Sequence, residues 1–308
     1  MKYCFNILLF CFFINVSSQN PNYTTQDIAI NKLIDGTLLS PKNRDSPKLA
    51  IIIAGSGPTD RNGNQNFLKS NSLKKLAESL TNRGIATFRY DKRIVKQILK
   101  NKVDPNMTFD DFVIDAISVI DYFKEKKSYS GIYIIGHSQG SLVGLLASKD
   151  RVDGFVSLAG AGQSIDEVIT QQIAAMDPTL IEGTKKAFES LKKGKLTNDY
   201  PQALGSIFRA DVQPFIMNWM QYNPQDILKS LDIPILIVNG TKDLQVSVDE
   251  AKLLKDASEK AELEIIDQMN HVLFIIEGGQ LENSKSYNES FREISEDLIS
   301  KVSHFILK

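Results

Sequence analysis

The chain has 308 residues, of which 42% are hydrophobic, and its formal net charge is −1. This composition supplies a sizeable apolar core and excludes a strongly basic surface, so we expect a small-molecule partner and no nucleic acid. The length is compatible with two domains or with one α/β domain that carries an insertion.

The first residues have the pattern of a secretory signal. One early positive charge, Lys2, precedes an apolar stretch that is too short to span a bilayer comfortably, and small residues precede Gln19. We therefore expect residues 1–19 to be removed as a signal peptide and the mature protein to be secreted or periplasmic, with no stable insertion in a membrane. An uncleaved membrane anchor is the alternative interpretation.

Both cysteines, Cys4 and Cys11, fall within this segment. Lipid attachment at Cys11 is disfavoured because the bulky Phe10 precedes it. The mature protein would then contain no cysteine, which excludes disulfides, a cysteine nucleophile and thiolate metal sites.

The mature chain opens with β-type patterns. Residues 28–40 are expected to form a hairpin that turns at Asp35-Gly36. The apolar run at 49–54 predicts a central strand buried on both faces. It leads into a loop with three glycines, residues 55–64.

That loop is placed to stabilise an oxyanion. A loop after a central strand supplies one backbone N–H to an oxyanion hole when the fold also carries a serine nucleophile, and we assign this donor to Ser56. The alternative is a phosphate cradle at residues 55–57, which lacks the lysine that a P-loop needs. Asp60 and Arg61 either brace the loop, face the substrate or contact solvent.

Helix and strand patterns alternate over the next stretch. Residues 69–83 predict a helix, 85–88 a strand and 108–126 an amphipathic helix. This alternation is typical of a parallel sheet with right-handed crossovers. The cluster Arg89-Tyr90-Asp91-Lys92-Arg93 stands at a strand end, where open α/β sheets bind ligands. Its charges either brace the floor of the site or contact the substrate.

An apolar strand pattern turns into a helical pattern within residues 132–144. The turn is Gly136-His137-Ser138-Gln139-Gly140, a G-x-S-x-G sequence in its required strand-to-helix setting. Such a turn lifts Ser138 clear of the sheet, and the flanking glycines let the backbone fold that tightly. Ser138 is the predicted nucleophile, and the Gln139 N–H is the predicted second oxyanion donor. The alternative is a glycine-rich turn with an incidental serine.

The strand expected at 154–159 is followed by a long stretch without β-type runs. Helices are expected at 165–176, 179–193, 201–208 and 212–221. An all-helical insertion between two strands has no place in the sheet, so we expect residues 161–230 to form a cap over its carboxyl edge. Six large cap side chains either line an apolar pocket or, as we favour, pack the cap's own core: Phe208, Phe215, Met217, Trp219, Met220 and Tyr222.

The sheet pattern returns in the last part of the chain. Strands are expected at 235–238 and 263–266, and an amphipathic helix at about 287–307 closes the domain. The first of these strands leads to Asp243 and the second to His271.

A serine nucleophile needs an adjacent base, and the base needs an acid that holds its tautomer. The chain offers three histidines. His137 adjoins the serine and is expected to point away, and His304 lies in the last helix, which leaves His271 as the predicted base. A structural loop histidine is the alternative interpretation of His271.

Asp243 is the predicted acid because it directly follows the strand after the cap. Asp249 and Asp267 are its rivals. Asp249 falls at a helix start, where it has a capping role, and Asp267 is too near His271 in sequence to orient it easily. The order serine, aspartate, histidine is that of an α/β-hydrolase.

Three stretches together carry a family resemblance. The loop at 55–64, the Arg-Tyr-Asp-Lys-Arg stretch at 89–93 and the Gly-His-Ser-Gln-Gly elbow at 136–140 resemble those of secreted bacterial esterases and serine aminopeptidase-like hydrolases of the α/β-hydrolase superfamily. Ala54 departs from the histidine often found before the loop, and Ile94-Val95 departs from a glycine-containing turn.

The resemblance implies an α/β-hydrolase fold with a mostly parallel sheet, flanking helices and a helical cap after the sixth strand. The core would comprise residues 20–160 and 231–308, and the cap residues 161–230.

The leading hypothesis is a secreted serine hydrolase that cleaves carboxylic esters through an acyl-enzyme, with a small-molecule ester as its partner and no cofactor or metal. An aminopeptidase is the first alternative and would need a cap carboxylate for the substrate amine: Asp166, Glu167, Asp177 or Glu182. A non-catalytic binding protein on the same fold is the second, although such a protein has no need for a complete triad.

Overall fold

The computed structural model describes residues 21–308, so the expected signal peptide at 1–19 lies outside the described residues. Within the described part, the strands form one eight-stranded sheet in the order β1-β2-β4-β3-β5-β6-β7-β8. The pairs β1–β2 and β2–β4 are antiparallel, and all other pairs are parallel. The strands are β1 Tyr23–Ala29, β2 Asp35–Pro41, β3 Lys48–Ile53, β4 Ala86–Tyr90, β5 Gly131–His137, β6 Gly154–Leu158, β7 Ile235–Gly240 and β8 Ala261–Ile266.

The central strands are buried on both faces, as their continuous apolar runs predict. Because successive side chains alternate between faces, each strand feeds two cores. In β3, Ile51 and Ile53 belong to one core, whereas Ala50 and Ile52 belong to the other. The sheet is thereby held between two apolar layers.

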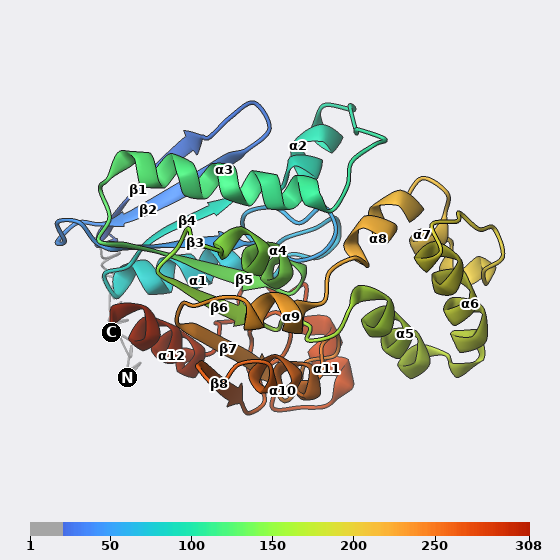
Figure 1. Cartoon of the computed structure of the whole chain (residues 1–308). Coiled ribbons are helices and arrows are strands. Elements are labelled where there is room, and N and C mark those ends of the chain that lie inside the picture. Colours follow the sequence, from blue (N-terminus) through green and yellow to red (C-terminus); the bar gives the residue numbers. More distant parts are fainter. Residues whose placement is uncertain (1–20) are drawn as a thin grey trace, which may run out of the picture.

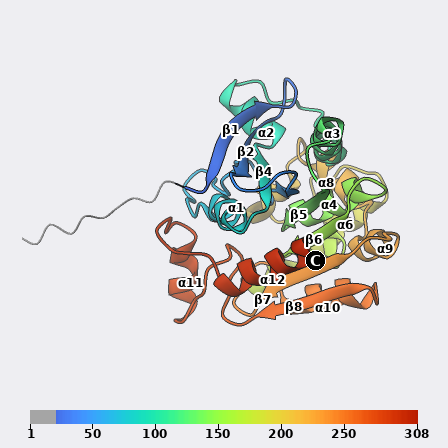
Figure 2. The ribbon, with the colours of Figure 1, turned by 90° about the vertical axis from the view of Figure 1, so that its left-hand side faces the viewer.

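Helices cover both faces of the sheet (Figures 1 and 2). Helices α3, α4, α9 and α10 supply the first core, and α1 and α12 supply the second. The helices outside the cap are α1 Ser72–Asn82, α2 Arg93–Leu99, α3 Asp110–Lys126, α4 Gln139–Ser148, α9 Pro224–Lys229, α10 Val248–Asp256, α11 Gln280–Ser286 and α12 Glu296–Leu307. Helix α9 falls within residues 161–230, the range expected for the cap, but its Leu228 packs in the first core of the sheet.

The insertion after β6 is helical, and it projects from one end of the sheet (Figure 1). Its helices form a small core of their own around Phe188, Leu191 and Phe208. They are α5 Ile165–Met176, η1 Pro178–Leu180, α6 Ile181–Lys192, η2 Gln202–Leu204, α7 Gly205–Phe208 and α8 Gln213–Trp219. The predicted fold class, with a cap after the sixth strand, is confirmed.

The predicted hairpin turn at Asp35-Gly36 is wrong. Both residues begin β2, and the chain turns earlier, where the Asn31 side chain accepts hydrogen bonds from the N–H groups of Leu33 and Ile34 at 2.8 and 3.0 Å. Gly36 serves packing instead, because a Cβ there would lie 2.1 Å from the Phe88 ring.

Two helix predictions at other places also need correction. The last helix begins at Glu296 and not near 287, because the Ser295 side chain caps it by accepting a hydrogen bond from the Leu298 N–H at 3.2 Å. The short helix α2, which begins at Arg93, was not predicted; the Arg93 guanidinium is held by Asp115 at 2.7 Å.

Candidate active site

Ser138 stands on the sharp turn between β5 and α4. Its φ is 54° and its ψ is −121°, a region that costs a non-glycine residue about 1–3 kcal/mol. Its N–H donates to the Leu158 carbonyl at 2.9 Å, which fixes the turn to β6. The surrounding fold therefore holds a strained serine at the carboxyl end of a central strand.

The flanking glycines are required by close backbone contacts. A Cβ on Gly136 would lie 2.3 Å from the Gly140 carbonyl oxygen, and a Cβ on Gly140 would lie 2.3 Å from the Ile53 carbonyl oxygen. The helix after the serine thus packs directly against the strand before it and against β3. The G-x-S-x-G spacing places a glycine at each of these two positions of close backbone contact.

His271 and Asp243 are brought together from loops that follow β8 and β7. Nδ1 of His271 lies 2.8 Å from Oδ2 of Asp243, and the side chains are 5% and 1% exposed. The other carboxylate oxygen accepts hydrogen bonds from the N–H groups of Gln245 and Val246 at 2.8 and 2.9 Å. A carboxylate held in this way accepts a hydrogen bond from a protonated Nδ1. The proton on Nδ1 leaves Nε2 with a free lone pair, so Nε2 can act as a base.

The rival acids lie elsewhere. The Asp249 side chain is 81% exposed and pairs with Lys252 at 2.8 Å. Asp267 is exposed and accepts a hydrogen bond from the Thr241 hydroxyl at 2.9 Å. Of the three candidates, only Asp243 contacts His271.

Ser138 and His271 line the same small cavity of about 90 Å³, together with Gly55 and Ser56. No hydrogen bond joins the Ser138 hydroxyl to His271 within residues 21–308. The loop passes close over the serine, because a Cβ on Gly55 would lie 3.1 Å from Cβ of Ser138. The predicted nucleophile, base and first oxyanion donor therefore face one space.

His137 takes part in the site, contrary to the expectation that it points away. Its Nε2–H donates to the backbone carbonyl of His271 at 2.8 Å, and the two rings lie 4.8 Å apart. Burial, with the neighbouring His271 ring, lowers the pKa of His137 to about 4, so the ring stays neutral. The residue before the nucleophile therefore holds the loop that carries the base. Only the adjacency of His137 to Ser138 signalled this in the sequence.

The loop at 55–64 is braced from within. Oδ1 of Asp60 accepts hydrogen bonds from the N–H groups of Asn62 and Asn64 at 2.8 and 2.9 Å. The Arg61 side chain binds Asp91 through Nε at 2.9 Å and Nη2 at 2.6 Å. Asp60 and Arg61 thus brace the loop, and two of the three stretches that carry the family resemblance, residues 55–64 and 89–93, are joined in space.

A larger cavity of about 860 Å³ lies between the sheet edge and the cap, and Ser56, Ser138 and Gln139 line its inner end. Most of its other lining is apolar and comes from both the core and the cap. Ile94, which replaces the family's glycine turn, lines it. The main apolar side chains are Ile94, Met107, Phe112, Leu142, Ile165, Val168, Ile169, Val212, Phe215, Ile216 and Trp219.

The six large cap side chains divide between the two predicted roles. Phe215 and Trp219 have both roles, because they line the 860 Å³ cavity and also pack against the cap's own core. Phe208, Met217 and Met220 belong to the cap's own core. Tyr222 instead fastens the end of the cap to α3.

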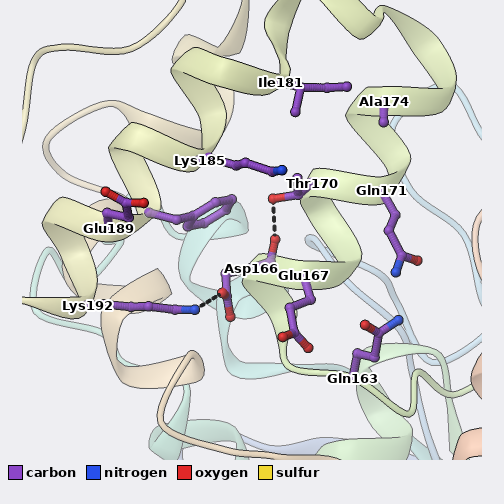
Figure 3. A pocket seen from close by; sticks show the side chains of 11 residues that line it. Gln163, Asp166, Glu167, Thr170, Gln171, Ala174, Ile181, Lys185, Glu189 and Lys192 are labelled. Carbon is purple, nitrogen blue, oxygen red and sulfur yellow. Dashed lines mark hydrogen bonds and ion pairs between the residues drawn. The ribbon is translucent and has the colours of Figure 1, made fainter.

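The candidate amine anchors do not line the Ser138 cavities. Asp166 and Glu167 line a separate cap cavity of about 490 Å³ between α5 and α6, which Figure 3 shows. Asp166 is 4% exposed, and one of its oxygens is bound by Lys192 at 2.5 Å. Asp177 accepts hydrogen bonds from Thr179, and Glu182 is exposed.

Within residues 21–308, no group of three or more His, Cys, Asp and Glu side chains is arranged to hold a metal ion. None of the helices in this part of the chain has the length and apolar character needed to cross a membrane.

Comparisons with known proteins cover different shares of the chain. Residues 68–204 match the family model described as serine aminopeptidase, S33. The chain is 28% identical over 267 residues to esterase EstD of Thermotoga maritima. That match covers 83% of this chain and 62% of EstD, so the chain spans less than two thirds of that relative's length.

Solved structures share the arrangement of the chain. Est1E from Butyrivibrio proteoclasticus, in a structure with ferulic acid bound, superposes with a TM-score of 0.58 at 19% identity, over 92% of this chain and 98% of that chain. An esterase from Pyrococcus furiosus gives a TM-score of 0.54 at 16% identity, over 92% and 90% of the two chains. At these identities the matches show the fold.

Proposed function

We propose that the chain, which has the α/β-hydrolase fold, is a secreted serine hydrolase that cleaves carboxylic esters. The observation that carries this proposal is the buried pair of His271 and Asp243, 2.8 Å apart, whose imidazole faces the same cavity as a serine on a strained elbow. A nucleophile, a base and an orienting acid are the parts that acyl transfer requires.

The proposed reaction begins at Ser138. Its Oγ attacks the ester carbonyl carbon while Nε2 of His271 takes the hydroxyl proton. The carbonyl oxygen becomes an oxyanion that accepts hydrogen bonds from the N–H groups of Ser56 and Gln139, each worth about 3–4 kcal/mol in such sites. The intermediate collapses, the C–O bond to the alcohol breaks, and His271 returns the proton to the leaving oxygen.

Deacylation repeats these steps with water. His271 takes a proton from water, the hydroxide attacks the acyl carbon, and the second intermediate expels Ser138 as it regains its proton. Asp243 keeps Nδ1 protonated throughout and stabilises the imidazolium that forms twice per cycle.

The lining of the 860 Å³ cavity supports a substrate with an apolar acyl or alcohol part. Phe112, Phe215 and Trp219 present aromatic surface there, and burial of apolar area contributes about 25 cal/mol per Å². None of the four candidate cap carboxylates lines this cavity. The carboxylates that do line it are Asp104 and Asp211, and Asp211 is already paired with Arg209 at 2.9 Å.

The proposal is tested on the purified protein with p-nitrophenyl esters of increasing acyl length beside amino-acid p-nitroanilides. We expect ester hydrolysis that Ser138→Ala abolishes. Hydrolysis of the anilides alone would establish the aminopeptidase instead, and binding of esters without turnover would establish the binding protein.

Secretion is tested separately. N-terminal sequencing of the protein exported by its native host is expected to begin near Asn20, and thiol titration of the unfolded mature chain is expected to find no cysteine. Two thiols per chain would mean that the segment with Cys4 and Cys11 is retained, and the anchor interpretation would replace secretion.

A further inference from the structure

Lys92 is a buried lysine beside the active site, and it lines the 860 Å³ cavity together with Ser56, Ser138 and Gln139. Its side chain belongs to the Arg-Tyr-Asp-Lys-Arg stretch and is 5% exposed. Nζ donates hydrogen bonds to the backbone carbonyls of Gly55 at 2.9 Å and Gly57 at 3.0 Å, and to Oε1 of Gln139 at 2.8 Å. One ammonium group thus joins the loop after β3 to the residue that follows the nucleophile.

These contacts bear directly on the Ser56 N–H. The Gly55 carbonyl and the Ser56 N–H belong to the same trans peptide, so they point in opposite directions. A cation that binds the carbonyl from one side therefore turns the N–H toward the other. It also polarises the peptide, which strengthens the N–H as a hydrogen-bond donor.

The second bond of Lys92 holds the loop further along, because the Gly57 carbonyl belongs to the Gly57–Pro58 peptide. The Ser56–Gly57 peptide between the two held carbonyls is fixed separately, since the Ser56 carbonyl accepts hydrogen bonds from the Thr59 hydroxyl at 2.7 Å and the Gln65 side-chain amide at 2.9 Å. The third bond ties this loop to Gln139, whose own N–H is the other proposed donor. The relative position of the two donors thereby depends on one side chain.

On the basis of the proposed function, we propose that Lys92 is a positioning residue of the oxyanion hole. Its ammonium orients the Ser56 N–H by holding the carbonyl of the same peptide, and it sets the distance of this N–H from the Gln139 N–H. Lys92 does not touch the reacting atoms; it acts through the two backbone donors.

The hydrogen-bond donors of Lys92 fit this role. A lysine ammonium has three N–H donors and no acceptor, and the three oxygens around Nζ use all three. The Phe112 ring lies 4.4 Å from Nζ and adds a cation–π contact. The titratable groups nearby are Tyr90 and Asp115, which line the same small internal space, and Asp115 is already paired with Arg93.

A buried ammonium costs folding free energy, and here burial lowers the pKa of Lys92 to about 7. A leucine or methionine would fill the same space without that cost. The lysine therefore stands at a position where packing alone favours an apolar residue, which is where functional groups are found.

The test compares Lys92→Met with the matched control Lys48→Met. Lys48 begins β3 at the opposite end from the loop, and its Nζ likewise donates to a backbone carbonyl, that of Ile306 at 2.7 Å, and lies 5.3 Å from the Tyr133 ring. Each variant removes a lysine that binds a carbonyl and an aromatic ring, but only Lys92 contacts the oxyanion loop.

The first readout is independent of turnover. In amide NMR spectra of the proteins without substrate, we expect the Ser56 resonance to shift in Lys92→Met and to stay in place in Lys48→Met. An unchanged Ser56 resonance in Lys92→Met would overturn the proposal. Because this arm needs no activity, it decides the role of Lys92 even if the chain fails to hydrolyse esters and the proposed function is wrong.

The second readout is kinetic. We expect Lys92→Met to lower kcat about 10²-fold with little change in KM, because misplacement of a catalytic group by about 1 Å costs that much. The affinity for a trifluoromethyl ketone, which forms a tetrahedral oxyanion adduct on the serine, is expected to fall by a similar factor. A purely structural lysine would lower the melting temperature but leave these ratios at their wild-type values.

Gln139→Leu tests the role of Lys92 in a second way, which is needed if Lys92→Met does not fold. This variant removes one acceptor of Lys92 and retains the Gln139 N–H, and we expect kcat to fall about tenfold. An unchanged kcat would overturn the proposed link between the two donors. Where both variants fold, the double variant is expected to lose less than the product of the two single losses.

Discussion

The core and the cap hold their charged side chains in different environments. In the core, Asp243 and His271 are 1% and 5% exposed and share a bond of 2.8 Å. In the cap, each ion pair keeps at least one exposed partner: Lys186 and Asp199 are 65% and 69% exposed, and the buried Asp166 pairs with a Lys192 side chain that is 54% exposed. Surface pairs of this kind contribute between 0 and about 1 kcal/mol.

The core and the cap therefore have different roles in the proposed reaction. The core is a two-sided sheet whose buried polar contacts fix the positions of the reacting groups. The cap has a small core of its own and contributes apolar side chains, such as Trp219, to the 860 Å³ cavity. We therefore expect core variants to change kcat and cap variants to change the choice of substrate.

The largest effect is expected from Ser138→Ala. Loss of a triad member lowers kcat by about 10⁴ to 10⁶, and the serine fills no core volume because it lies on the surface of a turn. The melting temperature should stay at or above that of the wild type, since alanine removes no packing there. Retention of more than a tenth of the ester activity would require another nucleophile.

The next effect is expected from Asp243→Asn. The N–H groups of Gln245 and Val246 select an oxygen at the Oδ1 position, so the amide NH₂ of asparagine must face Nδ1 of His271. That NH₂ favours the imidazole tautomer with its proton on Nε2, a change that costs about 10⁴ in kcat in a well-studied serine protease.

Asp249→Asn is the matched control for this assignment. Asp249 is exposed in the first turn of α10, so its loss should lower stability by about 1 kcal/mol or less and leave kcat unchanged. The two kcat values are compared on one ester. A larger loss from Asp249→Asn than from Asp243→Asn would refute the role of Asp243.

The same contrast explains what the sequence could predict. Ser138, Asp243 and His271 each follow a strand, and the carboxyl ends of parallel strands meet at one edge, so their pattern and order place them in one region. The elbow needs glycine at 136 and 140 because a Cβ at either position would clash with a backbone carbonyl oxygen. These features depend on local sequence and on the topology of the sheet.

Other contacts depend on where distant loops meet. Lys92 binds carbonyls more than 30 positions earlier, and His137 binds a carbonyl 134 positions later. No local pattern encodes these pairings. The cap acids were equally hard to place, because helical spacing predicts which residues share a face but not which face meets the cavity.

A cap variant is expected to change selectivity. Trp219 lines the cavity and stacks on Phe109 with ring centroids 5.2 Å apart. Trp219→Leu should enlarge the cavity and raise kcat/KM for long acyl chains relative to short ones by about tenfold, the low end of the effect of one methylene group in an apolar pocket.

Phe208→Leu is the control within the cap. Phe208 is fully buried in the cap's own core and does not line the cavity. It should lower stability by about 1–3 kcal/mol without changing the ratio of long to short esters. An equal change of that ratio in both variants would mean that selectivity follows cap stability and not cavity shape.

The smallest effect is expected where the cap is fastened to the core. The Tyr222 hydroxyl donates to Oδ1 of Asp110 on α3 at 2.5 Å. Burial and the neighbouring Asp110 raise the pKa of Tyr222 to about 12, so the phenol keeps its proton and donates at neutral pH. Tyr222→Phe keeps the ring against Phe109, 5.8 Å away, and removes only this hydrogen bond.

We expect Tyr222→Phe to cost about 1–2 kcal/mol, since the bond is made to a charged group that is partly buried. For a chain of this size the melting temperature should fall by only a few degrees, with kcat on a short ester unchanged. Tyr200→Phe is the control, because the Tyr200 hydroxyl makes no hydrogen bond within residues 21–308. A loss of kcat in Tyr222→Phe as large as that in a core variant would show that the attachment of the cap also controls the rate of the reaction. The assignment of kcat to the core and of substrate choice to the cap would then be wrong.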